Sequence, residues 1–177
     1  MKTTQILIAG FGGQGVLFAG KFLAYKGLVE EQQVSWLPSY GPEMRGGTAN
    51  CSVILSDAPV GSPIITNPDV LVAMNLPSLL KYMDSVVPGG KIFVDSTLIS
   101  EKVTRTDVEV FYVPASAMAR DAGFTTLANM VLMGKLIKET GVVAFDNNQL
   151  TFEKFIPAKK VNLIEQNCQA LQAGFDF

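Results

Sequence analysis

The residues with the clearest chemical potential form a glycine-rich turn near the amino terminus. The turn has the spacing G-x-G-x-x-G and lies between an apolar run at 5–9 and an amphipathic stretch at 16–28. A strand, a glycine turn and a helix in this order present backbone N–H groups and the positive end of a helix dipole to an anion. The residues concerned are Gly10, Gly12, Gly13, Gln14 and Gly15.

Three interpretations of this turn are open. A dinucleotide site needs an acidic residue at the end of the second strand to bind the ribose, but that strand ends at Leu37-Pro38 and the nearest acid is Glu43, in the loop beyond. An NAD(P) site is therefore disfavoured. A site for another phosphate, such as the diphosphate of coenzyme A, and simple close packing of the backbone remain equally open.

A second stretch of unusual composition is the loop 39–47, SYGPEMRGG. The planar guanidinium of its arginine suits a carboxylate or a phosphate, and its glycines allow close approach of another surface. An exposed loop with an internal Glu–Arg pair is the simpler interpretation. The loop follows a strand, where α/β folds bind ligands, and this position strengthens the ligand-binding interpretation relative to the exposed-loop one. The candidate residues are Tyr40, Glu43, Met44, Arg45 and Gly46.

Several kinds of catalytic centre are excluded by composition. The chain has no histidine, so it lacks the commonest general base and metal ligand. Its two cysteines, Cys51 and Cys168, are too few for a Cys-ligated iron–sulfur cluster and are predicted to be buried thiols. We therefore expect no catalytic residue and no metal site on this chain alone.

The overall composition predicts one folded domain over residues 1–177. Hydrophobic residues make up 48% of the chain and charged residues 17%, which predicts a sheet buried on both faces and further apolar surface for a partner. A net charge of −2 argues against nucleic-acid binding. No apolar run is long enough to cross a membrane and no leader is recognisable, so a cytoplasmic location is expected.

Strands and helices alternate along the chain. This order predicts a three-layer, doubly wound α/β domain with a mostly parallel sheet and a Rossmann-like glycine turn after the first strand. Strands are expected at 5–9, 34–37 (stopped by Pro38), 48–55, 69–74, 91–94 and 109–113. Helices are expected at 16–28, 76–86, 115–121, 127–140 and 158–173, the last of them after a tail segment at 150–156.

Three polar residues at or near the ends of these elements have simpler roles than catalysis. Asn75 and Asp95 both follow strands. Asn75 is predicted to cap the next turn, and Asp95 is predicted to be the N-cap of a helix. Asn129, inside an apolar helix, is predicted to be a buried amide that specifies packing or meets a partner.

Four segments together resemble the gamma subunits of the 2-oxoacid:ferredoxin oxidoreductases, a family that includes 2-oxoglutarate, ketoisovalerate and pyruvate enzymes. They are IAGFGGQGVLFAGKFLA, PSYGPEMRGGTANCSVILSD, SPIITNPDVLVAMN and NMVLMGKL. The resemblance runs from Ile6 to about Gly141 and is weaker beyond. The chain length is more similar to the separate small subunit of the 2-oxoglutarate enzymes than to the longer, fused versions.

The resemblance implies the CoA-dependent oxidative decarboxylation of a 2-oxoacid, with 2-oxoglutarate favoured, to an acyl-CoA and CO2 with electrons passed to ferredoxin. It implies a complex that uses thiamine diphosphate, magnesium and iron–sulfur clusters. Those groups would be bound by alpha, beta and, where present, delta subunits, because this chain has no ligand set for them. The glycine turn would then meet a phosphate or a partner backbone, and the loop 39–47 would point into a cleft between subunits.

Two alternatives to a complex with a ligand-binding gamma subunit remain. One is an assembly module that stabilises its partners and touches no ligand. The other is a separate Rossmann-type enzyme that binds NAD(P), which the missing acidic ribose partner disfavours.

Overall fold

The computed structural model describes residues 2–40 and 48–177, with the backbone alone for Tyr40. The strands are β1 (Thr3–Phe11), β2 (Gln33–Tyr40), β3 (Thr48–Ser56), β4 (Val70–Ala73), β5 (Lys91–Asp95) and β6 (Glu109–Val113). The α-helices are α1 (Val16–Val29), α2 (Leu76–Tyr82), α3 (Ala115–Asp121), α4 (Ala128–Thr140), α5 (Asn148–Glu153) and α6 (Val161–Asp176). Two short 3-10 helices, η1 (Met83–Ser85) and η2 (Ala158–Lys160), follow α2 and precede α6.

The strands form a six-stranded sheet in the order β2-β3-β1-β4-β5-β6. The pairs β1–β4, β4–β5 and β5–β6 are parallel, whereas β3 runs antiparallel to both of its neighbours. The predicted mostly parallel sheet is confirmed. The antiparallel β2–β3 pair has a simple cause, because residues 41–47 alone connect the two strands and a parallel pair needs a crossover of a dozen residues or more.

One predicted strand boundary is wrong. Pro38 does not stop the second strand, because β2 continues to Tyr40 and Pro38 pairs in register with Cys51. Since β2 lies at the edge of the sheet, the side that bonds no neighbour can carry the proline nitrogen, which has no hydrogen to donate.

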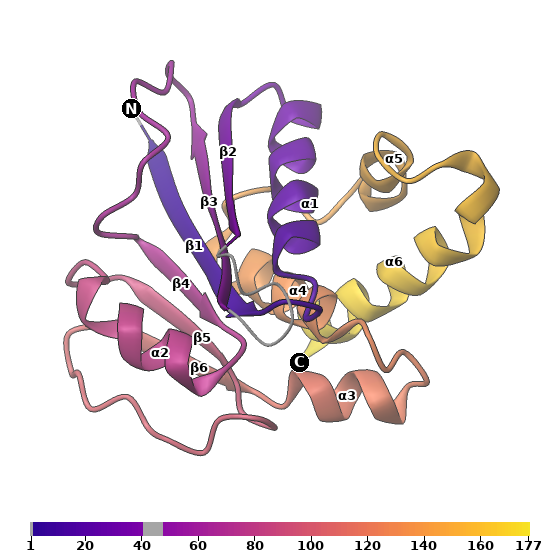
Figure 1. The fold of residues 1–177 in the computed structure, drawn as a ribbon. Coiled ribbons are helices and arrows are strands. Elements are labelled where there is room, and N and C mark those ends of the chain that lie inside the picture. Colours follow the sequence, from indigo (N-terminus) through magenta and orange to yellow (C-terminus); the bar gives the residue numbers. More distant parts are fainter. Residues whose placement is uncertain (1, 41–47) are drawn as a thin grey trace.

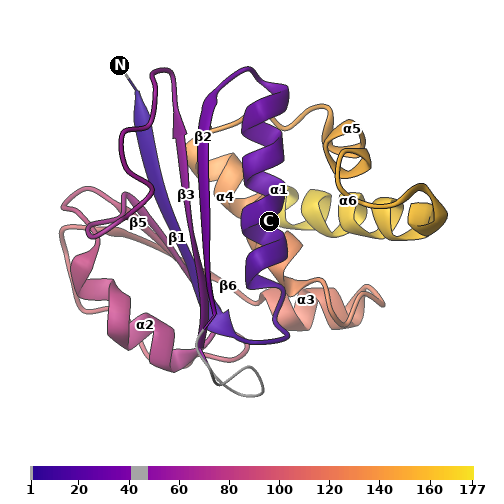
Figure 2. The same cartoon turned by 45° about the horizontal axis from the view of Figure 1, so that its top comes forward.

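Helices cover both faces of the sheet, as Figures 1 and 2 show. On one face α1 and α4 bury a core that includes Phe22, Phe93 and Met130, and α6 packs on the outer side of α4. On the other face α2 and the segment after β5 cover a smaller core that includes Leu71, Leu79 and Ile99. The single, layered α/β fold is as predicted, with α6 added outside the three layers.

The outer helix α6 is held against α4 by a close approach of the two backbones. A Cβ atom on Gly134 would overlap the carbonyl oxygen of Leu171, and one on Gly174 would overlap that of Val131. Only glycine therefore fits at these two positions. The sequence pattern predicts both helices, but it does not predict this contact.

Cys51 lies in the core under α1, fully buried, with its Sγ donating to the carbonyl oxygen of Val16 at 3.4 Å. Burial raises the pKa of the Cys51 thiol to about 12, so the neutral thiol persists at physiological pH. Cys168 is half-buried and is also free, and its pKa is raised by burial and by nearby Glu153. The prediction of a buried thiol is confirmed for Cys51 and holds only partly for Cys168.

Within residues 2–40 and 48–177, no helix has the length and apolar character needed to cross a membrane.

We expect Gly134→Ala to lower the free energy of unfolding by about 3 kcal/mol, because the new methyl group forces α6 away from α4. Urea unfolding followed by circular dichroism measures this. Gly61→Ala is the matched control: no atom lies within 4 Å of the added methyl, so its effect should stay within about 0.5 kcal/mol. Equal effects of the two substitutions would contradict the close-packing account.

Candidate functional site

The centre of the sheet is a topological switch point. β1 and β4 are parallel neighbours, but α1 follows β1 onto one face of the sheet and α2 follows β4 onto the other (Figure 1). Open α/β sheets bind ligands at the carboxyl ends of the strands where this reversal occurs. The glycine turn follows β1, and Asn75 follows β4, so both lie at this position.

The glycine turn is tied to the end of β4 by Gln14. Its Oε1 accepts a hydrogen bond from the Phe11 backbone N–H at 2.6 Å, and its Nε2 donates to the Met74 carbonyl oxygen at 2.9 Å. The Phe11 N–H therefore donates to Gln14 and is not available to donate to a bound phosphate. The same side chain fixes the position of the turn relative to β4.

The glycines of the turn divide into packed and open positions. A Cβ on Gly10 would come within 3.0 Å of the Met74 Cβ, whereas a Cβ on Gly13 would have no atom within 4 Å. Gly13 also has φ of +95°, in the left-handed region that favours glycine. Gly12 is half-buried. Close packing thus explains Gly10, while Gly13 is free to face a ligand or partner.

The close contact at Gly15 is with helix α4 and not with a strand. A Cβ there would overlap the side chain of Asn129 in α4, whose Nδ2 donates to the Gly15 carbonyl oxygen at 3.0 Å. The contact between α1 and the sheet is made instead at Gly20, against Cys51 and Trp36. The predicted packing role of the buried amide of Asn129 is confirmed.

At the end of β4, Asn75 caps α2 as predicted, because its Oδ1 accepts from the Ser78 N–H at 2.8 Å. This cap does not use every polar atom of the Asn75 and Ser78 side chains. Asn75 Nδ2 and Ser78 Oγ are buried, and neither has a hydrogen-bond partner among the residues that the structure describes. A buried donor without a partner costs free energy, so these atoms are candidates to contact a ligand or an ordered water.

The next strand along the sheet ends in Asp95, which has a structural role. Its carboxylate is fully buried and accepts from Ser116 Oγ at 2.5 Å and from the Thr97 N–H at 3.1 Å. It also accepts from the Ser116 N–H at the start of α3, at 3.3 Å. Asp95 is thus not the predicted N-cap of a helix, because a turn follows it and the N-cap of α3 is Pro114. Across the ranges 2–40 and 48–177, no group of three or more potential metal ligands is present.

The second candidate stretch falls largely outside the described residues, which exclude Glu43, Met44, Arg45 and Gly46 and the side chain of Tyr40. The residues on either side of it are described. Tyr40 pairs with Ala49, and Thr48 pairs with Phe11 at the start of the glycine turn. The glycine turn after β1 and the stretch between β2 and β3 therefore lie at the same end of the sheet, because β3 pairs with both β1 and β2.

Sequence reasoning missed Ser78 and Asn167, whose side chains are buried without a full set of partners. The sequence position of each residue gave a signal that could have identified it. Ser78 stands three residues after the capping Asn75, and Asn167 lies on the buried stripe of α6 with Ile164, Ala170 and Leu171.

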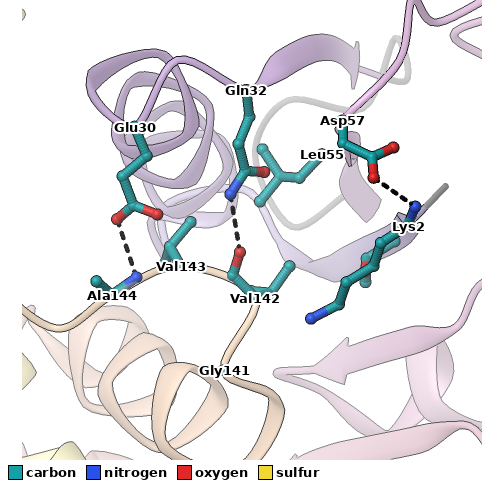
Figure 3. A pocket seen from close by; sticks show the side chains of 10 residues that line it. Lys2, Glu30, Gln32, Leu55, Asp57, Gly141, Val142, Val143 and Ala144 are labelled. Carbon is teal, nitrogen blue, oxygen red and sulfur yellow. Dashed lines mark hydrogen bonds between the residues drawn. The ribbon is translucent and has the colours of Figure 1, made fainter.

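A hollow at the opposite end of the sheet, where β1 begins and β3 ends, has a structural role (Figure 3). Glu30 Oε1 accepts from the Ala144 N–H at 2.9 Å, and Gln32 Nε2 donates to the Val142 carbonyl oxygen at 3.1 Å. Close by, the fully buried ammonium of Lys26 pairs with Glu30 at 3.2 Å and with the Asp146 carbonyl oxygen. These groups attach the segment after α4 to the end of α1, so few of them remain for a ligand.

The sheet order and the glycine turn define a Rossmann-like α/β domain with its candidate site at the switch point. The chain belongs to the pyruvate ferredoxin/flavodoxin oxidoreductase family, whose model matches residues 5–177.

Curated relatives of two lengths match the chain. It is 42% identical over 174 residues to the ketoisovalerate oxidoreductase subunit VorA of Methanothermobacter thermautotrophicus, a match that covers 98% of this chain and 36% of that protein. It is 38% identical over 181 residues to the 2-oxoglutarate synthase subunit KorC of Methanothermobacter marburgensis, covering 96% of this chain and 94% of KorC. The chain thus spans about a third of VorA and nearly all of KorC.

Solved structures show the same fold. The gamma subunit of a keto/oxoacid ferredoxin oxidoreductase from Geobacter sulfurreducens superposes with a TM-score of 0.85 at 29% identity, covering 99% of this chain and 96% of that one. A 2-oxoglutarate:ferredoxin oxidoreductase from Magnetococcus marinus, solved with 2-oxoglutarate, coenzyme A and succinyl-CoA bound, superposes with a TM-score of 0.89 at 22% identity. In the latter the match covers 99% of this chain and 31% of the other, and it supports the fold alone.

We expect Gln14→Ala to lower the free energy of unfolding by about 1–2 kcal/mol, because the Phe11 N–H and the Met74 carbonyl oxygen lose their partner at a partly exposed position. Thermal or urea unfolding measures this. The control is Gln172→Ala, which removes a single exposed side-chain contact with Asp176 and should change stability by less than about 0.5 kcal/mol. If Gln14→Ala were as mild as the control, Gln14 would not be holding the turn to β4.

Proposed function

We propose that this chain is the gamma subunit of a 2-oxoacid:ferredoxin oxidoreductase. The complex would carry out the CoA-dependent oxidative decarboxylation of a 2-oxoacid to an acyl-CoA and CO2 and pass the electrons to ferredoxin. The carrying observation is the match over nearly the full length of both chains to the gamma subunit from Geobacter sulfurreducens, at 29% identity and with a TM-score of 0.85. A family member of this size acts as one part of a larger assembly.

For the substrate we propose 2-oxoglutarate. Three archaeal KorC proteins, named as 2-oxoglutarate synthase subunits, are 31–38% identical to this chain, and the chain spans 92–94% of each. The alternative is 2-ketoisovalerate, favoured by the 42% identity to VorA. The match covers 36% of VorA but 94% of KorC, so the KorC names carry more weight for the proposed substrate.

In the proposed complex, thiamine diphosphate, magnesium and iron–sulfur clusters would be bound by the alpha, beta and, where present, delta subunits. Thiamine diphosphate supplies the carbanion chemistry of decarboxylation when bound. This chain has no histidine and two distant cysteines, so it offers no Cys-ligated cluster site of its own. Its own contribution would be to complete the assembly and one wall of the site where coenzyme A or the 2-oxoacid binds.

The switch point is the part of this chain that we propose for that wall. Gly13 is exposed there, and Asn75 Nδ2 and Ser78 Oγ are buried beside the turn with no hydrogen-bond partner among the described residues. We propose that the turn, Gly10, Gly12, Gly13, Gln14 and Gly15, approaches a phosphate or a partner backbone, as the fold class commonly does. The loop with Tyr40, Glu43, Met44, Arg45 and Gly46 begins from the adjacent strands and would complete this wall.

An affinity purification from native cytosol tests the proposed function. The chain should co-purify with thiamine- and cluster-bearing subunits, and the eluate should reduce a viologen dye only when coenzyme A and a 2-oxoacid are both present. A clear preference for 2-oxoglutarate over 2-ketoisovalerate and pyruvate is expected. Recovery of the chain alone, with affinity for NAD(P) and no dye reduction, would instead support a separate Rossmann-type enzyme.

We expect Arg45→Ala in the purified complex to raise the apparent KM for coenzyme A or the 2-oxoacid about tenfold, because a charge-assisted pair with an anion is lost. Assembly, measured by gel filtration, should not change. The matched control is Arg120→Ala, which removes an exposed guanidinium paired only with the adjacent Asp121 in the described structure. Unchanged kinetics together with unchanged assembly would favour the assembly-module alternative.

A further inference from the structure

A groove on the α6 side of the molecule shares Gly15 with the glycine turn, and the rest of its lining has no role in the proposed function. It has a volume of about 330 Å³ and lies between the start of α1, the turn before α4, the turn around η2 and the first half of α6. In Figure 2, α6 runs out to the right behind α1. The walls are largely apolar, with Phe18, Leu127, Phe155 and Leu163 among the lining side chains. This is the size and character of a site for a small ligand.

One polar side chain in the lining is left without a full set of partners. Asn167 is 3% exposed, and its Nδ2 donates to the Leu163 carbonyl oxygen at 2.6 Å. Its Oδ1 is buried and has no hydrogen-bond partner in the described parts of the chain. A buried acceptor left unpaired destabilises the fold, and a ligand that brings an N–H or O–H group would remove that cost.

The electrostatics of the groove favour an anion. Three long helices, α1, α4 and α6, begin at residues that line it: Gly15, Leu127 and Lys160. None of these three starts has a side-chain cap or an acidic residue in its first turn. Lys160 is exposed and forms no ion pair within the described ranges, and no acid is among the lining residues. The uncompensated positive helix ends and the ammonium group attract negative charge.

We propose that this groove binds an apolar carboxylate that carries one hydrogen-bond donor, the chemistry of an N-acylated amino acid. The side chain of the ligand packs on Phe18, Leu127 and Leu163, and its N–H donates to Asn167 Oδ1. Its carboxylate lies toward Lys160 or a helix start. A free acyl amino acid and the carboxyl-terminal residue of a peptide share this chemistry. The site shares Gly15 with the turn at the switch point but is otherwise built from other residues, and the proposal does not depend on which 2-oxoacid the complex uses.

The test is a calorimetric titration of the protein, in the assembly in which it purifies, with N-acetyl-L-leucine. We expect a dissociation constant in the millimolar range or below. Two analogues probe the two polar requirements: N-acetyl-L-leucinamide lacks the charge, and 4-methylpentanoate lacks the N–H. Each should bind at least about tenfold more weakly. Equal binding of either analogue, or no binding of N-acetyl-L-leucine up to about 10 mM, would overturn the proposal.

Two variants test whether N-acetyl-L-leucine binds in the groove. Lys160→Gln and Asn167→Leu should each weaken the binding of N-acetyl-L-leucine about tenfold. The control is Lys159→Gln, which removes an adjacent exposed charge that does not line the groove and should leave binding unchanged. Asn167→Leu also removes the Nδ2 bond to the Leu163 carbonyl oxygen, so its melting temperature is measured alongside. An unchanged melting temperature shows that the lost binding is not caused by unfolding. Binding unaffected by both groove variants would contradict the assignment.

The same titration distinguishes the two sources of the ligand. The peptide N-acetyl-Ala-Ala-Leu has the same charged end on a longer chain. Binding as tight as that of N-acetyl-L-leucine indicates that the groove receives the end of a polypeptide, whereas markedly weaker binding indicates a free acyl amino acid.

Discussion

The parallel pairing of β1 with β4 is the contact on which the rest of the structure depends. Ile6, Leu7, Ile8 and Ala9 pair in register with the four residues of β4, and most of these side chains are almost fully buried. Because the helices that follow the two strands pass to opposite faces, this pairing creates the switch point and separates the two cores. The glycine turn and Asn75 come together only through it.

Polar side chains hold the glycine turn in position. One of them also occupies a backbone N–H that could otherwise bind a ligand. Gln14 bonds to β1 and β4, and Asn129 bonds to the backbone of Gly15. The turn is therefore partly self-satisfied, unlike a phosphate loop with all of its N–H groups free. This arrangement suits a surface that positions a group held mainly by other subunits, which agrees with the role proposed for the chain in an assembly.

The apolar composition also has a structural explanation in two parts. Both faces of the sheet are covered by helices, and α6 packs outside α4 through Gly134 and Gly174. These contacts bury much of the 48% of the chain that is hydrophobic. Exposed apolar residues remain on several elements, among them Leu37, Leu80 and Val161. Burial within the subunit thus explains most of the composition.

The sequence by itself determined the fold class, the glycine turn, the strand at 109–113, the helix at 115–121 and the family. These depend on local periodicity, on turn residues and on motifs contiguous in the chain. Only the tertiary structure decided that β3 runs antiparallel and that Pro38 lies within an edge strand. It also decided that Gly15 packs on Asn129, and that Asn167 Oδ1 is buried with no partner among the described residues. Each of these depends on contacts between residues far apart in the chain, which local patterns do not encode.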